Sequence, residues 1–212
     1  MIRGTSLSLT LAAMTLVAPA LYGQVPYRVK DINPTLQPSS ASNVSNIARV
    51  GDAVYFSAAD GQNGTELWTS DGTAAGTHLV KDIFQGVSSS SPARLTSAGG
   101  LLFFTISGLT QLWRSDGTEG GTLLLRSFSS LGLGTSFQGM FFFGADGQLW
   151  KSDGTPSGTV PVKDTPGSTL ENPGAFTVVG DRLFFTAAAS LGRTCLPFIG
   201  SAVGPEVSLE HD

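Results

Sequence analysis

The sequence predicts an all-β protein made of tandem four-stranded sheets, and three observations support this fold class. A Leu-Trp-x-Ser-Asp-Gly-Thr motif occurs three times in the 212-residue chain. A glycine turn and a run of strand-forming aliphatic and aromatic residues precede each copy. The 27 glycines and 11 prolines predict many turns and no long helices. A unit that recurs in this way indicates a repeat protein.

The first half of each repeat unit predicts two strands and a tight turn. A glycine turn opens the unit, and an aromatic run forms the first strand, at residues 51–56, 99–104, 139–143 and 180–185. The Leu-Trp run forms the second strand, in the motif copies at residues 65–73, 111–118 and 148–155. In Ser-Asp-Gly-Thr, the Asp side chain can bond its own backbone two residues on and Gly accepts a positive φ, so this segment is expected to turn.

The second half of the unit predicts two further strands. In the first copy, a Gly-Thr pair leads into a third strand at residues 78–83, a serine-rich loop covers residues 88–92, and residues 93–96 form a fourth strand. Four short strands in a unit of this length are typical of a β-propeller blade. The alternatives are a β-solenoid, whose coil is usually shorter, and a β-sandwich, which needs no sequence repeat.

The chain divides into three predicted parts. Residues 1–23 are expected to be a secretory signal peptide, with Arg3 ahead of an apolar stretch and a small-x-small sequence at residues 18–20; an N-terminal core helix is the alternative. Residues 24–187 are expected to form the repeats. The non-repeat tail, residues 188–212, is expected to be disordered or the product of truncation or a frameshift.

The repeats predict about three and a half blades, because the fourth glycine-aromatic run is not followed by a Trp motif. Residues 28–32, Arg-Val-Lys-Asp-Ile, match the end of a unit whose front half is missing. Two interpretations follow. The strand at residues 27–32 pairs with the unfinished last blade and closes a small ring, or the chain is a fragment of a longer protein and associates with further propeller repeats. The second is favoured.

The motif resembles a known family. Glu-Leu-Trp-Thr-Ser-Asp-Gly-Thr at residues 66–73 and the segment that follows at residues 76–83 are similar to the ELWxxDGT repeat, also called hyalin-like, of secreted or surface bacterial proteins. The resemblance implies tandem propeller-type blades and no established catalytic residues. The chain departs from the pattern at Gln111 and Gln148, which replace the signature Glu, and at residues 126–127, where Arg-Ser replaces Lys-Asp.

Composition and residue spacing exclude several chemistries. Net charge is −4 and no run of Lys and Arg is present, so nucleic-acid binding is not expected. His78 and His211 have no partner at metal-ligand spacing, and Cys195, the single cysteine, can form no internal disulfide. No phosphate-binding loop or dinucleotide fingerprint occurs. The sequence therefore predicts no catalytic residue, no cofactor and no metal ligand, and no integral membrane segment after signal cleavage.

Two motif residues allow a second interpretation. Asp71, Asp116 and Asp153 could bind calcium, but each motif offers one carboxylate, so a turn-capping role is favoured. The three tryptophans, Trp68, Trp113 and Trp150, could stack on sugars, but a Trp at a fixed repeat position is more often a packing residue.

The expected function is non-catalytic. The chain is predicted to be a secreted or cell-surface repeat protein that acts as a scaffold for binding an unidentified protein or carbohydrate. The alternatives are a fragment of a secreted propeller hydrolase or lyase, and a calcium-dependent adhesion module.

Overall fold

The structure is a computed structural model that describes residues 27–33, 42–106, 108, 110–162, 171–189, 192–199 and 208–209; side chains are described up to residue 188. Regular structure in this part of the chain is entirely β. No apolar helix of membrane-spanning length occurs in it. The predicted signal peptide at residues 1–23 and His211 lie outside the described residues.

Four antiparallel sheets, here called blades 1 to 4, follow one another along the chain, and each contains four strands that pair in sequence order. Blade 1 contains β1 (Ser45–Val50), β2 (Ala53–Ala59), β3 (Thr65–Ser70) and β4 (His78–Lys81). Blade 2 contains β5 (Ala93–Ala98), β6 (Leu101–Ile106), β7 (Gln111–Ser115) and β8 (Leu123–Ser127). Blade 3 contains β9 (Leu131–Phe137), β10 (Met140–Ala145), β11 (Gln148–Ser152) and β12 (Val160–Pro161). Blade 4 contains β13 (Glu171–Val179), β14 (Arg182–Ala189), β15 (Gly192–Ile199) and β16 (Ser208–Leu209).

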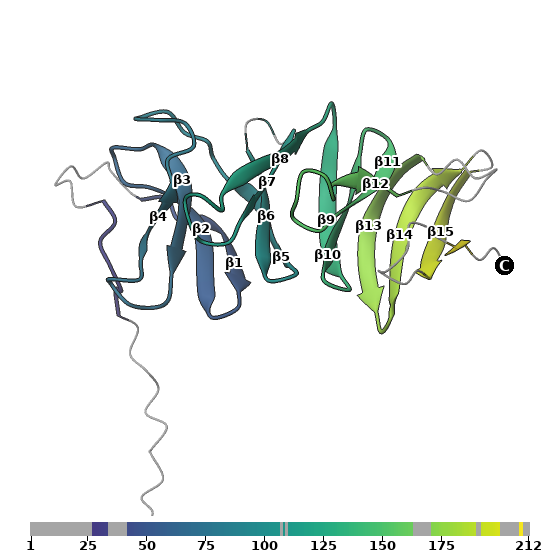
Figure 1. Ribbon diagram of the computed structural model, residues 1–212, viewed down its shortest axis with the longest axis horizontal. Helices are drawn as coiled ribbons and strands as arrows, with labels where there is room; N and C mark the ends of the chain where they lie inside the picture. Colours follow the sequence, from purple (N-terminus) through teal and green to yellow (C-terminus); the bar gives the residue numbers. More distant parts are fainter. Residues whose placement is uncertain are drawn as a thin grey trace, which may run out of the picture.

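The blades confirm the predicted class, tandem four-stranded blades of the propeller type, and they do not close into a ring. They lie in a row with blade 1 and blade 4 at opposite ends (Figure 1). The first strands of neighbouring blades contact one another, β1 with β5, β5 with β9 and β9 with β13. This line of first strands, here called the axial edge, is therefore shared by all four blades.

The blade boundaries differ from the predicted unit. Residues 93–96 were expected to end the first unit, but they open blade 2, because β5 pairs with β6 through the turn at Gly99 and Gly100. Both glycines have positive φ, +58° and +79°, which a two-residue hairpin turn requires. A short glycine turn holds two strands in one sheet, whereas the long connection after β4 leads to the next one.

Blade 4 contains more regular structure than the sequence predicts. Without a fourth Trp motif, the sequence predicts a half blade and a non-repeat tail at residues 188–212 that is either disordered or the product of truncation or a frameshift. In the structure, β15 pairs with β14 from Gly192 to Phe198, and Ser208–Leu209 pairs with the end of β15. Sheet pairing uses backbone groups, so a segment without repeat character can complete a sheet.

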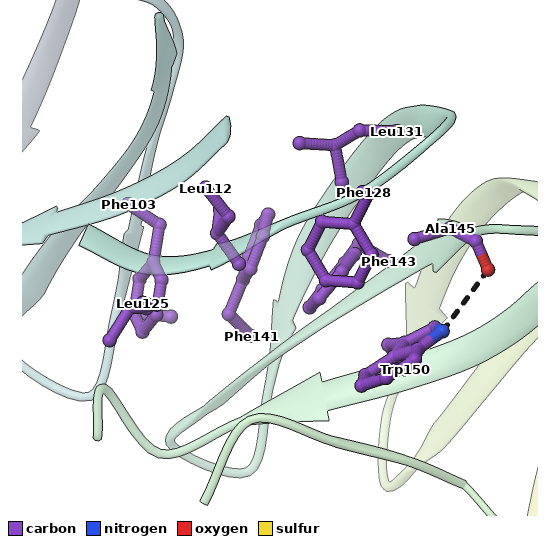
Figure 2. Packing of buried hydrophobic residues seen from close by; sticks show 10 residues of the cluster. Phe103, Leu112, Leu125, Phe128, Leu131, Phe141, Phe143, Ala145 and Trp150 are labelled. Carbon is purple, nitrogen blue, oxygen red and sulfur yellow. Dashed lines mark hydrogen bonds between the residues drawn. The ribbon is translucent and has the colours of Figure 1, made fainter. Parts of the chain in front are cut away.

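Apolar layers between the blades form the core. Along the second strand of each blade, successive side chains point to opposite faces of the sheet, so neighbouring aromatic residues lie on opposite faces. Phe103 of β6 faces blade 3 and Phe104 faces blade 1, and both are buried. In the layer between blades 2 and 3, the rings of Phe103 and Phe141 stack with centroids 4.8 Å apart, and those of Phe128 and Trp150 form a T-shaped contact with centroids 5.0 Å apart (Figure 2).

Each motif tryptophan faces the blade that precedes its own. Trp113 packs in the layer shared with blade 1, and Trp150 packs in the layer shared with blade 2. The indole nitrogen Nε1 of Trp150 donates to the Ala145 carbonyl at 3.1 Å (Figure 2). The Arg126 guanidinium lies 4.7 Å from the centroid of Trp150, a cation–π contact that also covers the ring. These contacts give the tryptophans a packing role.

Candidate functional site

The three Ser-Asp-Gly-Thr turns have one shared hydrogen-bond pattern. In blade 2, Oδ1 of Asp116 accepts from the backbone N–H of Thr118 at 2.9 Å and from its hydroxyl at 2.7 Å. The Thr118 hydroxyl oxygen accepts in turn from the backbone N–H of Gly121 at 2.9 Å. The same bonds, within 0.1 Å, occur around Asp71 and Asp153. Each aspartate therefore caps its own turn through Oδ1.

A pair of hydroxyl groups closes the base of each turn. Thr122 donates to the Thr118 carbonyl at 2.7 Å, and its hydroxyl lies 2.8 Å from that of Ser115. Both side chains are fully buried. A Cβ on Gly121 would overlap the Asp116 carboxylate, so the glycine of the Gly-Thr pair leaves room for the acidic side chain. The motif and the Gly-Thr pair thus form one self-contained unit.

Hydrogen bonding favours the charged form of Asp71 and Asp116. The hydroxyl and backbone N–H of Thr73 lower the pKa of Asp71, and those of Thr118 lower the pKa of Asp116. Each carboxylate belongs to a separate exposed turn. The described residues contain no group of three or more His, Cys, Asp or Glu side chains that could hold a metal ion.

Glu66 is a buried carboxylate whose role the sequence motif does not reveal. It lies in β3 and accepts from the Ser90 backbone N–H at 2.8 Å, the Ser90 hydroxyl at 2.5 Å and the Ile83 backbone N–H at 3.2 Å. Burial raises its pKa against the effect of these bonds, and the charge of Asp82 adds to the increase. Glu66 therefore fastens the connection between blades 1 and 2 to β3.

The positions equivalent to Glu66 in blades 2 and 3 have different contacts. Gln111 accepts from the indole N–H of Trp113 at 3.3 Å, and Gln148 is exposed. The signal that could have identified Glu66 is the combination of the signature Glu with the serine-rich loop, because a buried carboxylate needs donors and the loop supplies them.

A pocket of about 220 Å³ opens at the axial edge between blades 2 and 3. Its walls are mostly apolar and include Leu131 of β9 and Phe104 of β6. Arg94 of β5 contributes the charged group, and its Nη1 donates to the Leu131 carbonyl at 2.6 Å. Arg94 has φ +54° at a bulge in β5, which turns the strand locally and directs its side chain toward blade 3.

The bulge recurs along the axial edge. Asn46 in β1 and Ala175 in β13 also have positive φ, +50° and +49°, at irregular points of the strand pairing. Beside the bulges, Ile47 of β1 and Leu133 of β9 are 68% and 67% exposed. A second pocket of about 240 Å³ lies between blades 3 and 4, with Ser130, Asn172 and Pro173 in its wall. Apolar side chains and small pockets therefore gather on this edge.

The residues considered for catalysis lie far apart. His78 is exposed on β4 of blade 1, whereas Cys195 lies in β15 of blade 4, opposite Thr186 in register. These blades are the two ends of the row (Figure 1). The structure does not bring His78 and Cys195 together.

Comparisons with known proteins found no matching family model and no matching curated protein. The chain is similar to two solved structures of puromycin hydrolase. One is the S511A mutant complexed with PGG, with 20% identity, a TM-score of 0.46, and coverage of 76% of this chain and 29% of that one. The other has 19% identity, a TM-score of 0.49, and coverage of 78% and 30%. The chain thus spans under a third of their length.

Proposed function

We propose that this protein is a non-catalytic, exported or cell-surface repeat protein of the ELWxxDGT type that serves as a binding scaffold. The axial edge is its ligand surface, and the ligand is a protein or a carbohydrate. The observation that carries the proposal is the position of the pocket at Arg94 on this edge, next to the exposed Leu133. Concave, mostly apolar sites with a few polar groups are the usual form of a binding site.

The repeated polar residues support this division of roles. The Ser, Asp and Thr side chains of each motif form hydrogen bonds within their own turn, so they stabilise the blade. The axial edge carries side chains that the turn chemistry does not use. A rigid scaffold with contacts at one edge is a common arrangement for recognition.

The test is binding of the mature protein, residues 24–212, to an array of glycans and surface proteins. Ile47→Asp and Leu133→Asp change exposed side chains on the axial edge, so the fold is expected to persist. Val87→Asp, at a side chain that is 82% exposed in the connection between blades 1 and 2, is the matched control.

We expect each axial substitution to weaken binding by about tenfold, because the loss of one well-packed apolar contact costs about 1.4 kcal/mol. The control should bind like the wild type. Equal binding by all three variants would show that the ligand surface lies elsewhere, and the absence of any ligand on the array would remove the support for a glycan- or protein-binding role.

A further inference from the structure

Residues 27–33 pack on the outer face of blade 1, yet they lie in none of the four sheets that the structure describes. Ile32 contacts the cluster of Phe56, Ala58 and Trp68, on the face of blade 1 that points away from blade 2. In Figure 1 this segment lies beyond blade 1, at the end of the row. The segment therefore covers the side of blade 1 where a preceding blade would stand.

A lysine contact shows which part of a blade this segment replaces. In blade 1, Lys81 of β4 reaches across to blade 2 and donates to the Thr122 carbonyl at 3.0 Å. Lys30 donates to the Thr77 carbonyl at 2.6 Å. Thr77 and Thr122 are the same residue of the Gly-Thr pair, and Lys30 and Lys81 both belong to a Lys-Asp-Ile sequence. Lys30 thus makes the same contact with blade 1 that Lys81 makes with blade 2.

The apolar residue that follows the outermost strand of a blade also contacts the Trp of the next blade, and Ile32 makes the equivalent contact. Ile83, after β4, packs in the layer that contains Trp113 of blade 2, and Phe128, after β8, packs on Trp150 of blade 3. Ile32 is in the corresponding position against Trp68 of blade 1. Residues 27–32 therefore occupy the place of the outermost strand of a blade ahead of blade 1.

The other end of the row offers the complementary face. Phe184 in β14 corresponds to Tyr55, Phe103 and Phe142, which are 5%, 1% and 2% exposed because the next blade covers them. Phe184 is only half-buried, and no blade stands beyond it in the described structure. Blade 4 thus presents the face that in blades 1 to 3 packs against a following blade.

We propose that two copies of this chain associate head to tail, with residues 27–32 of each copy adding as an outermost strand to blade 4 of the other. Blade 4 of one copy then packs against blade 1 of the second through the same kind of interface that joins the blades within a chain. Two copies of four blades give eight, within the range of about four to eight at which propellers close. Closure covers the open face at each end of the row and leaves only the short outer edges that propeller blades keep.

Part of the outer edge of β15 is unpaired in the described part of blade 4. β16 pairs only with Phe198 and Ile199 of β15, so the earlier part of β15 has no strand beyond it among the described residues. Cys195 there corresponds in register to Leu67 of β3, whose partner in β4 is Lys81. The residue opposite Cys195 in the incoming strand is therefore Lys30.

The first test is the mass of the purified protein in solution, measured by light scattering over a range of concentrations. We expect a dimer, with Phe184→Asp shifting it to a monomer and Val87→Asp leaving it dimeric. A monomeric wild type would overturn the proposal. Open polymers that lengthen with concentration would overturn the closed ring, because a heterologous contact that fails to close makes filaments.

The second test uses the single native cysteine. Lys30→Cys should form a disulfide with Cys195 of the second copy under mild oxidation, because residues directly opposite in antiparallel strands have Cα atoms about 4.5–5.5 Å apart, which is within the range that a disulfide spans. Lys30→Cys combined with Cys195→Ser should not cross-link, and Ser89→Cys is a control for random exposed thiols. A dimeric band supports head-to-tail pairing. An internal disulfide in a monomer would show that the chain closes on itself, and a folded variant without any cross-link would contradict the pairing.

Discussion

At the residue scale, the repeated motif is a set of short-range hydrogen bonds. The longest separation within a turn, from Ser115 to Thr122, is seven residues. Because the donors and acceptors are so near in sequence, the capping role of Asp71, Asp116 and Asp153 could be predicted from the motif alone. The room that Gly121 leaves for the Asp116 carboxylate depends on the same local segment.

The turn geometry predicts that calcium does not stabilise the protein. Oδ1 of each motif aspartate is already an acceptor for two donors of its own turn, and the three turns belong to different blades. We expect the melting temperature to be the same in millimolar calcium and in EDTA. A rise in calcium that disappears in Asp116→Asn would favour the adhesion alternative.

Glu66 predicts an unusual pH dependence. Its pKa is raised above the ordinary value of 4.5, so the folded state holds its proton more tightly than the unfolded state. The free energy of unfolding should therefore fall as pH rises from about 4.5 through the raised pKa. A carboxylate whose pKa is the same in the folded and unfolded states causes no such decrease in the free energy of unfolding.

Glu66→Gln isolates this effect. The amide cannot accept from all three donors, so at acidic pH the variant should be less stable by about 1–3 kcal/mol. Its stability should lack the decline with rising pH that Glu66 causes. Urea unfolding at several pH values measures both, with Gln148→Glu at the exposed equivalent position as the control. An unchanged pH profile in Glu66→Gln would contradict the assignment.

At the element scale, glycine hairpins bring neighbouring blades together. The Gly99 turn of blade 2 touches the Gly139 turn of blade 3, and a Cβ on Gly99 would overlap the Gly139 carbonyl. Gly100 has a similar positive φ and open space around its Cα. Gly99 is therefore required both by its backbone conformation and by the close approach of blade 3, whereas Gly100 is required by its backbone conformation alone.

Gly99→Ala and Gly100→Ala form a matched pair for this prediction. Gly100→Ala should cost about 1–2 kcal/mol, the penalty of a non-glycine residue in the left-handed region. Gly99→Ala should cost clearly more, because the blades must also move apart. Thermal or urea unfolding of both variants measures the difference, and equal losses would show that the hairpins do not pack as described.

At the scale of the whole molecule, the layers between blades contain the large buried apolar side chains. Each blade alone would expose an apolar face, so neighbours are needed to bury Phe103, Phe143 and Leu183. Phe103 is 1% exposed in the layer that Figure 2 shows. The interblade layers are therefore the place where a single truncation affects the entire row.

Phe103→Ala should lower the free energy of unfolding by about 3–5 kcal/mol, the usual cost of emptying a buried phenylalanine site. Val178→Ala, at a side chain that is 40% exposed on β13, should cost about 1 kcal/mol or less. Urea unfolding followed by tryptophan fluorescence reports both. Similar losses in the two variants would mean that blades 2 and 3 are not joined through this layer.

The glycine-aromatic strands, the Leu-Trp strands and the capped turns could be predicted from the sequence, because they depend on side-chain alternation and on bonds between residues a few positions apart. The structure was needed to show that residues 93–98 open blade 2, that β15 completes blade 4 and that Arg94 lines a pocket at the axial edge. It also placed residues 27–33 on blade 1. These features depend on backbone pairing and on contacts between distant segments, which leave no periodic pattern in the chain.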